Sequence, residues 1–381
     1  MDLTLNEDQE AFGASVTDAL ARKYTPDFRA ASAASDTGWD AGVYSTLAEI
    51  GLAALTIDED HDGLDAGAGE VYAALYALGQ HAAVEPFLDG VYLPSWLIGQ
   101  AAQGSDLLSA LAAGEATAAL AHSEPRRVWD AIPMTQATDS GNGVTLSGTK
   151  TAVAHGDQAS HYLVTATGDA GFGVYLVAAD ADGISRADGR AADWTRSSVV
   201  TFENSAAILL GSSGDAARAA FDVAVARARV AVLAEAVGLM DRASTITIEY
   251  LKSRKQFGVT LSTFQALVHR AADLYAEVEL ARSVALWATA SLERDAEAGT
   301  DDIDLIGTAD DAYVYIAQAA RVVAEEVVQL HGGIGMTYET PISHFATRLT
   351  TISQVYGGIS AARRRVLASD SPLVTPSVVH H

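Results

Sequence analysis

The spacing of apolar residues changes twice along this chain, and that change limits the folds it can adopt. Up to about residue 115 and again from about residue 214, apolar residues recur every three to four positions, which predicts amphipathic helices. Between these parts, apolar residues alternate or run continuously in short segments that predict strands. These segments are 144–156, 161–168, 172–180 and 197–204.

No helical pattern separates the predicted strands, which are joined by turn-forming residues such as those at 139–142 and 168–171. Strands in direct succession favour a small antiparallel barrel or sandwich over a doubly wound parallel sheet. We therefore expect a mainly α-helical protein with a central β-domain. The expected divisions are an N-terminal helical domain at 1–115, a middle β-domain at 116–213 and a C-terminal helical bundle at 214–381.

Local signals support the helical parts of this layout. Asn6 followed by Gln9 predicts a helix N-cap with its capping-box partner. A stripe containing Val43 and Leu47 is followed by Gly51, a residue typical of a helix C-terminus. Only 8 of the 381 residues are proline, so few helices are expected to be interrupted.

Composition excludes several classes of function. With 24 Lys plus Arg against 49 Asp plus Glu, the net charge is −25 at pH 7, and nucleic-acid binding is not expected because phosphate contacts need clustered cations. The absence of cysteine excludes disulfides, thiolate nucleophiles and Cys-based metal sites, and no His or acidic pair has metal-ligand spacing. An acidic N-terminus and the lack of a run of about 18 apolar residues predict a cytoplasmic protein with no membrane contact.

Two segments of the C-terminal part carry residues suited to ligand binding. The first is 254–258 (RKQFG), followed by Phe264 and Gln265, and the second is 328–336 (VQLHGGIGM). A guanidinium beside an aromatic ring suits an anionic ligand with a flat ring, and adjacent glycines let a backbone approach a ligand closely. Taken singly, such segments are more often a solvated helix-end charge and a helix C-cap.

Taken together in a helix–β–helix chain, these segments resemble the acyl-CoA dehydrogenase family, and the resemblance covers nearly the whole chain. Residues 47–52 and 85–87 also match recurrent stretches of that family. The resemblance implies N-terminal helices, a middle antiparallel β-barrel and a C-terminal four-helix bundle. It also implies a dimeric or tetrameric flavoenzyme that binds FAD between subunits and oxidises an acyl-CoA thioester.

The resemblance assigns binding roles to particular residues. Arg229 matches a family arginine that we expect near the substrate. No G-x-G-x-x-G motif follows a strand, which agrees with the resemblance because this family does not use a Rossmann site. The residues that match contacts to the adenosine and pyrophosphate half of a neighbouring subunit's FAD are Arg254, Phe257, Gln265, Gln329, Gly332 and Gly333.

The chain departs from the family where the chemistry occurs. In the family, a carboxylate removes the α-proton of the acyl-CoA while the β-hydrogen leaves as hydride to the flavin. The usual glutamate position is Gly357 here, and an alternative position for the base, just before Arg229, is Ala228. Neither residue can accept a proton, so we assign no catalytic residue to this chain.

The surroundings of the flavin ring are changed as well. Segment 123–129 replaces a loop rich in glycine and serine, and segment 152–156 replaces a strand whose Trp and Thr contact the isoalloxazine. Leu349 replaces an acidic residue that usually follows Arg348. Other acids and histidines near these segments are expected to be surface, capping or hydrogen-bonded structural residues and not replacement bases. They are Glu124, Glu203, Glu325, Glu339, His155 and His331.

Three functions agree with this pattern. The favoured one resembles the base-lacking subunit of actinobacterial heterotetrameric (α2β2) acyl-CoA dehydrogenases, some of which act on steroid side-chain CoA esters. There, a paralogous catalytic partner supplies the base and the flavin pocket. The second is a self-sufficient flavoprotein of the same fold with another chemistry, such as a flavin-dependent monooxygenase, although the changed flavin contacts count against it. The third is a binding protein with neither flavin nor CoA.

Overall fold

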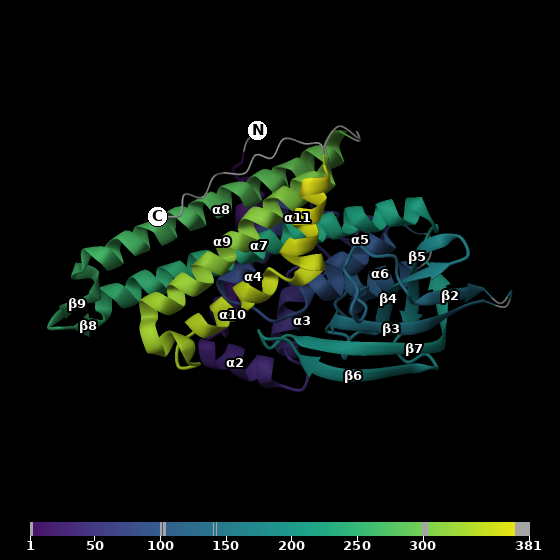
Figure 1. Ribbon diagram of the computed structural model, residues 1–381, viewed down its shortest axis with the longest axis horizontal. Helices are drawn as coiled ribbons and strands as arrows, with labels where there is room; N and C mark the ends of the chain where they lie inside the picture. The colour runs from purple at the N-terminus through teal and green to yellow at the C-terminus, as the bar shows by residue number, and fades with distance from the viewer. Residues whose placement is uncertain are drawn as a thin grey trace.

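The computed structural model describes residues 3–99, 101, 104–139, 141, 143–298 and 304–369. Long helices lie side by side along the molecule, and a β-sheet domain packs at one end of them (Figure 1). A small hairpin, β8–β9, lies at the opposite end of the long helices (Figure 1). The two ends of the molecule are therefore built from different parts of the chain.

The N-terminal part is helical, as the apolar spacing predicts. Its first helix begins with the predicted capping box, in which Asn6 Oδ1 accepts from the Gln9 backbone at 2.9 Å and Gln9 Oε1 accepts from the Asn6 backbone at 3.0 Å. Val16 and Leu20 on the same helix are buried. The elements of this part are α1 (Glu7–Ala21), α2 (Pro26–Ala34), α3 (Ala41–Glu49), η1 (Glu59–His61), α4 (Ala68–Gln80), η2 (Leu88–Tyr92), α5 (Leu93–Ile98) and α6 (Ser105–Ala112).

The middle part is a sheet that closes on itself. Its hydrogen-bonded order is β1-β4-β2-β3-β7-β5, β5 pairs back with β4, and β6 pairs with β7. Tyr162, Val164 and Phe202 are among the side chains buried inside it. The strands are β1 (Ala118–Ala121), β2 (Gln136–Asp139), β3 (Val144–Ala154), β4 (His161–Gly168), β5 (Gly171–Ala178), β6 (Ile184–Arg190) and β7 (Arg196–Leu209).

The C-terminal part is a helical bundle that also packs against the N-terminal helices. α7 meets α4 where Gly238 approaches Tyr76: a Cβ built on Gly238 would lie 2.1 Å from the Tyr76 carbonyl oxygen, so only glycine fits. The elements are α7 (Asp215–Ser253), β8 (Lys255–Gln256), β9 (Val259–Thr260), η3 (Leu261–Thr263), α8 (Gln265–Ala298), α9 (Leu305–His331), η4 (Gly332–Met336), α10 (Ile342–Ile352), η5 (Val355–Gly357) and α11 (Gly358–Ala368).

The fold class predicted from the sequence is confirmed: helices, then a barrel-like sheet, then a helical bundle. One detail differs, because β4 pairs in parallel with β1 and with β2, while the other barrel pairings are antiparallel. Strand β6 was not predicted, because six of its seven residues are exposed and its sequence lacks an apolar face. In the ranges described above, no helix is both long and apolar enough to cross a membrane.

Candidate functional site

A cavity of about 500 Å³ lies between the barrel and the C-terminal helices and includes several of the positions singled out in the sequence. Gly357 lines it from the turn between η5 and α11, and Ala152 and Ala154 line it from β3. A larger cavity of about 610 Å³ lies among α1, α4, α7 and α8, but contains none of the predicted site residues. The smaller cavity is therefore the candidate active site.

Gly357, the expected position of the catalytic base, faces an indole ring. A Cβ built on Gly357 would lie 2.7 Å from Trp129 Cγ and 2.9 Å from Ala361 Cβ, closer than real Cβ contacts allow. The backbone at Gly357 has a φ of +90°, which side-chain-bearing residues rarely adopt. Residue 357 therefore offers no proton acceptor, and Trp129 occupies the space that a side chain there would enter.

Trp129 is held in this place by a buried histidine. His122 lies with its ring centroid 4.3 Å from that of Trp129, and its Nε2 is 2.9 Å from the Trp129 carbonyl oxygen. Because a carbonyl only accepts, Nε2 carries the proton, and Nδ1 accepts from Thr165 Oγ1 at 2.8 Å. Burial lowers the pKa of His122 to about 3, so the ring is neutral at physiological pH.

The loop that carries Trp129 is anchored to the barrel by a buried ion pair. Lys150 Nζ lies 2.8 Å from Glu124 Oε1, and both side chains are almost fully buried. Glu124 also accepts from the backbones of Met134 and Thr135 at 2.7 and 2.8 Å. Burial alone would raise the pKa of Glu124, but these hydrogen bonds outweigh it and lower the pKa to about 2. Glu124 is therefore a buried structural carboxylate, where the sequence predicted a surface or capping one.

The strand position that contacts the flavin ring in the family lies at a bulge. The register of β3 against β7 shifts between Lys150 and Val153, and Ala152 adopts a φ of +51°. Both Ala152 and Ala154 line the cavity with methyl groups only. These two positions of β3 therefore offer neither a stacking ring nor a hydroxyl donor.

A carboxylate enters the cavity from the N-terminal part of the chain. Asp89 lies on the π-helical turn η2 and lines the cavity, and its Oδ1 accepts from Tyr356 Oη at 2.6 Å. Arg348 lines the same cavity and donates to Glu235 Oε1 at 2.6 Å and to Asp193 Oδ2 at 3.0 Å. The sequence did not single out Asp89, although a lone acid within the apolar run 86–93 (PFLDGVYL) was a usable signal.

Arg229 and Ala228 do not line this cavity. Arg229 is buried; its Nη2 donates to the Tyr356 carbonyl oxygen at 2.6 Å, and its Nη1 donates to Asp310 Oδ1 at 3.0 Å. These bonds fix the backbone immediately before Gly357. A contact between Arg229 and a substrate stays a prediction.

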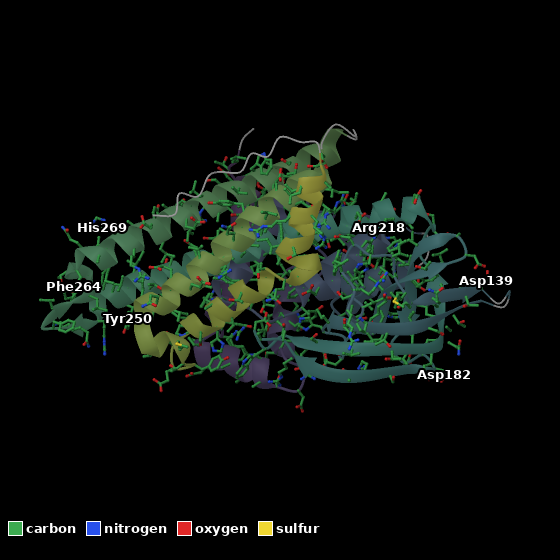
Figure 2. All side chains as sticks on the ribbon, viewed as in Figure 1. Asp139, Asp182, Arg218, Tyr250, Phe264 and His269 are labelled. Atoms are coloured by element: carbon green, nitrogen blue, oxygen red, sulfur yellow. The ribbon has the colours of Figure 1, made fainter. Side chains whose placement is uncertain are left out.

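The residues expected to contact the adenosine half of FAD lie at the opposite end of the bundle. Figure 2 labels Phe264 and Tyr250 at this end and Arg218 beside the barrel. All six residues expected to contact the adenosine half are exposed; the side chain of Phe257, at the β8–β9 turn, is 91% exposed. They come from the residue after α7, the β8–β9 turn, the start of α8, the last turn of α9 and the start of η4, and they are Arg254, Phe257, Gln265, Gln329, Gly332 and Gly333.

Helix α7 runs without interruption from beside the cavity to the exposed cluster. Phe221, on α7, lies with its ring centroid 4.8 Å from that of His122, beside the cavity, and Arg254 directly follows the last residue of the same helix. At 1.5 Å per residue, these two positions are roughly 50 Å apart. The near edge of the cavity, where Arg348 bonds Glu235 on α7, is roughly 28 Å from Arg254 along the same helix.

Comparison with known proteins gives the family. Models described as the N-terminal and C-terminal domains of acyl-CoA dehydrogenase match residues 6–115 and 215–371. The acyl-CoA dehydrogenase FadE28 of Mycobacterium tuberculosis is 30% identical, over 94% of this chain and 96% of its own length. The chain belongs to the acyl-CoA dehydrogenase family.

Further acyl-CoA dehydrogenases match over nearly the full chain. FadE27 of M. tuberculosis is 28% identical over 96% of this chain and 98% of its own length. A solved variant of the Tcur3481-Tcur3483 steroid ACAD is 31% identical with a TM-score of 0.86, covering 96% of this chain and 98% of that one. The ChsE4-ChsE5 complex from M. tuberculosis has a TM-score of 0.86 over 98% of this chain and 100% of that one, and its 24% identity supports the fold alone.

Acyl-CoA dehydrogenases are FAD-dependent, so the residues present were tested against that cofactor. At the exposed cluster, a Cβ on Gly332 or Gly333 would meet no atom within 4 Å, so the backbone there is open to a ligand. Arg254 is exposed beside it and can pair with a pyrophosphate. These residues fit the adenosine and pyrophosphate half of FAD. The cavity, by contrast, presents Trp129 and two alanines where the acyl-CoA dehydrogenase family binds the ring.

Most of the other acids and histidines named from the sequence have the predicted surroundings, and His155 differs. Glu203, Glu325 and Glu339 are exposed, as predicted. His331 is buried, with Nδ1 2.9 Å from the Val327 carbonyl oxygen, as predicted for a structural residue. His155 is buried, but its Nδ1 has no hydrogen-bond partner among the described residues. Within the same part of the chain, no group of three His, Asp or Glu side chains could hold a metal ion.

Proposed function

We propose that this acyl-CoA dehydrogenase family chain is the non-catalytic subunit of a hetero-oligomer and that it lends adenosine-side contacts to the FAD of a catalytic partner. The observation that carries the proposal is the contact between Trp129 and Gly357. A carboxylate at residue 357 would need both a new side chain and a displaced indole. The indole of Trp129 fills the space that a side chain at residue 357 would enter.

The distance along α7 supports sharing of the cofactor between subunits. The exposed cluster is roughly 28 Å along α7 from the near edge of the cavity, where Arg348 bonds Glu235, so a flavin held at the cluster would place its ring in a neighbouring chain. FAD, when bound, accepts the hydride in this family. The residues of this chain would hold the adenosine half: Arg254 would pair with the pyrophosphate, and Gly332 and Gly333 would let the backbone approach it.

The proposed partner is a paralogous catalytic acyl-CoA dehydrogenase subunit that supplies the base and the ring pocket. Two of the similar solved structures carry paired names, Tcur3481-Tcur3483, a steroid ACAD, and the ChsE4-ChsE5 complex. An acyl-CoA thioester, with a steroid side chain as the first acyl group to try, is accordingly the proposed substrate of the complex. We also place the complex in the cytoplasm as part of this proposal.

A second candidate is a self-sufficient flavoprotein that needs no α-proton base. It is favoured by the cavity itself, which remains about 500 Å³ in volume with an aromatic ring, Trp129, in its wall. The visible spectrum of the purified chain separates the candidates. A flavin-free chain that gains FAD only with a partner supports the hetero-oligomer, and a chain that binds about one FAD by itself supports the second candidate. A chain that stays flavin-free with every partner is a binding protein.

The sharpest test is Arg254→Ala in the reconstituted complex. Charge-assisted hydrogen bonds contribute about 1.5–3 kcal/mol, so FAD affinity should fall about ten- to a hundredfold while thermal stability is kept. Arg22→Ala, which removes an exposed arginine at the end of α1, is the matched control and should leave flavin occupancy unchanged. Unchanged occupancy in Arg254→Ala would remove the assignment.

A further inference from the structure

Asp89 is a carboxylate inside the candidate cavity that the proposed function leaves without a role. It is partly exposed, and it is the one Asp or Glu among the described residues that line this cavity. It reaches the cavity from η2, a π-helical turn, and such turns occur frequently at functional sites. The cavity therefore contains a proton-accepting group on a different element from the two positions that the family uses.

The carboxylate of Asp89 is oriented by its neighbour. Tyr356 Oη donates to Oδ1 at 2.6 Å, and burial together with the negative charge of Asp89 raises the pKa of the Tyr356 hydroxyl, which keeps it a donor. The Tyr356 backbone is itself fixed by Arg229, through Nη2 at 2.6 Å and Nε at 3.2 Å. Oδ2 of Asp89 receives no hydrogen bond from the described residues, so one oxygen is held and the other is available.

Cationic and titratable groups face Asp89 from other elements. Arg348, on α10, and His155, after β3, both interact electrostatically with it, and Arg348 is a permanent cation. Arg127 also lines the cavity; its Nη2 donates to the Ile132 carbonyl oxygen at 2.9 Å, and it makes no ion pair within the described ranges. The cavity thus combines a carboxylate with positive charge that can stabilise an oxyanion.

We propose that Asp89 accepts a proton from the α-carbon of an acyl-CoA thioester bound in this cavity, and that the flavin-free chain exchanges this hydrogen with solvent. Oδ2 forms a bond to the proton as the Cα–H bond breaks, and the electron pair moves into the thioester to give the enolate. The reverse step returns a proton that has exchanged with water. Nothing is oxidised, so the step needs no flavin. It rests on acyl-CoA as the ligand class, and not on the non-catalytic role in dehydrogenation.

The experiment follows deuterium at the α-carbon. The full chain, purified without FAD, is incubated in D₂O with butyryl-CoA, octanoyl-CoA and a steroid side-chain CoA ester, while calorimetry measures binding of each. Mass spectrometry then records deuterium uptake. Because a general base contributes about 10²–10⁴-fold, Asp89→Asn should slow enzyme-dependent exchange at least tenfold without abolishing ester binding. Asp182→Asn, which alters an exposed aspartate of the barrel (labelled in Figure 2), should change neither.

Tyr356→Phe gives an independent readout if Asp89→Asn fails to fold, as a thermal melt would reveal. This variant keeps the carboxylate but removes the hydroxyl that orients it, so exchange should slow and its pH dependence should shift. Binding of at least one ester together with Asp89-dependent exchange supports the proposal. Binding without Asp89-dependent exchange overturns it, and so does the absence of binding by all three esters. Neither result touches the flavin-retention test of Arg254.

Discussion

The indole of Trp129 lies against Gly357 so closely that a Cβ at residue 357 would be 2.7 Å from Trp129 Cγ. The pairing links two segments more than 200 residues apart, the loop after β1 and the turn before α11. It explains why the missing base is not a single-residue change. Reversing Gly357 alone would place a side chain where a ring already packs.

A double-mutant cycle tests this packing. Gly357→Ala should lower the free energy of unfolding by about 2–4 kcal/mol, because it combines backbone strain at a positive φ with overpacking against the indole. In a Trp129→Ala background the clash with the indole should disappear while the contact with Ala361 Cβ stays, giving a coupling of about 1–3 kcal/mol in urea titrations. Gly258→Ala, at a φ of +82° with no atom within 4 Å, is the matched control for backbone strain alone. Additive effects of Gly357→Ala and Trp129→Ala would contradict the contact.

The isolated chain should show no measurable acyl-CoA dehydrogenase turnover. Neither Gly357 nor Ala228 can accept a proton, and a general base typically contributes about 10²–10⁴-fold. The preparation should also be colourless, because Ala152 and Ala154 provide no contacts for a flavin ring. Dye reduction and the visible spectrum measure the two properties. Robust turnover by a yellow, homogeneous chain would refute both expectations.

Breaking the buried Lys150–Glu124 pair should be strongly destabilising. Lys150→Met leaves a buried carboxylate without its cation, which typically costs about 3–5 kcal/mol in the free energy of unfolding. The double variant Lys150→Met/Glu124→Gln should recover part of that loss, because no net charge stays buried. As a control, Arg218→Met breaks the partly exposed Arg218–Asp222 pair and should cost less than about 1 kcal/mol. Equal losses in the two single variants would show that the buried pair has no special role.

The stability of this protein should fall as pH rises from about 4.5 to about 7, through Glu85. Burial raises the pKa of Glu85 to about 7; Tyr24 Oη donates to Oε2 at 3.1 Å, and Oε1 has no partner among the described residues. In the unfolded chain this carboxyl ionises at lower pH, so the unfolded state releases its proton first and gains stability relative to the folded state. Glu85→Gln should therefore be more stable than the wild type at pH 8, by up to about 3 kcal/mol, and similar to it at pH 4.

Denaturant titrations at both pH values measure this difference. Glu49→Gln, at an exposed position of α3, is the matched control and should behave alike at the two pH values. A Glu85→Gln variant that is less stable than the wild type at pH 8 would show that the ionised carboxylate is tolerated in the core.

Local sequence patterns predicted most of the helices, strands and turns, whereas the positions that depend on long-range packing were not predicted. The capping box of Asn6 and Gln9 and the turn between β4 and β5 depend on residues close in sequence, so their spacing predicted them. Strand β6 lacks an apolar alternation because it lies at the edge of the sheet with its side chains exposed. Its position depends on β7, which no local pattern reveals.

In the candidate site as well, single positions could be named from the sequence, whereas contacts between distant segments could not. Gly357 and Ala228 were identified from single positions, because a missing carboxylate is visible in the sequence. The indole that fills the space beside Gly357 was not, because its position depends on His122 and on the Glu124–Lys150 pair, which ties the loop after β1 to strand β3. Asp89 was missed for a similar reason: its partner, Tyr356, lies 267 residues away.

The continuity of α7 fixes the orientation of the surface around Arg254 relative to the barrel. Because the helix runs without a break from Asp215 to Ser253, inserting a single residue at its middle would rotate one end by about 100° relative to the other and translate it by about 1.5 Å. The surface that includes Arg254 would then face a different direction from the one set by the barrel. In the proposed complex, the number of residues in this helix would therefore set the direction in which the surface around Arg254 meets a neighbouring chain.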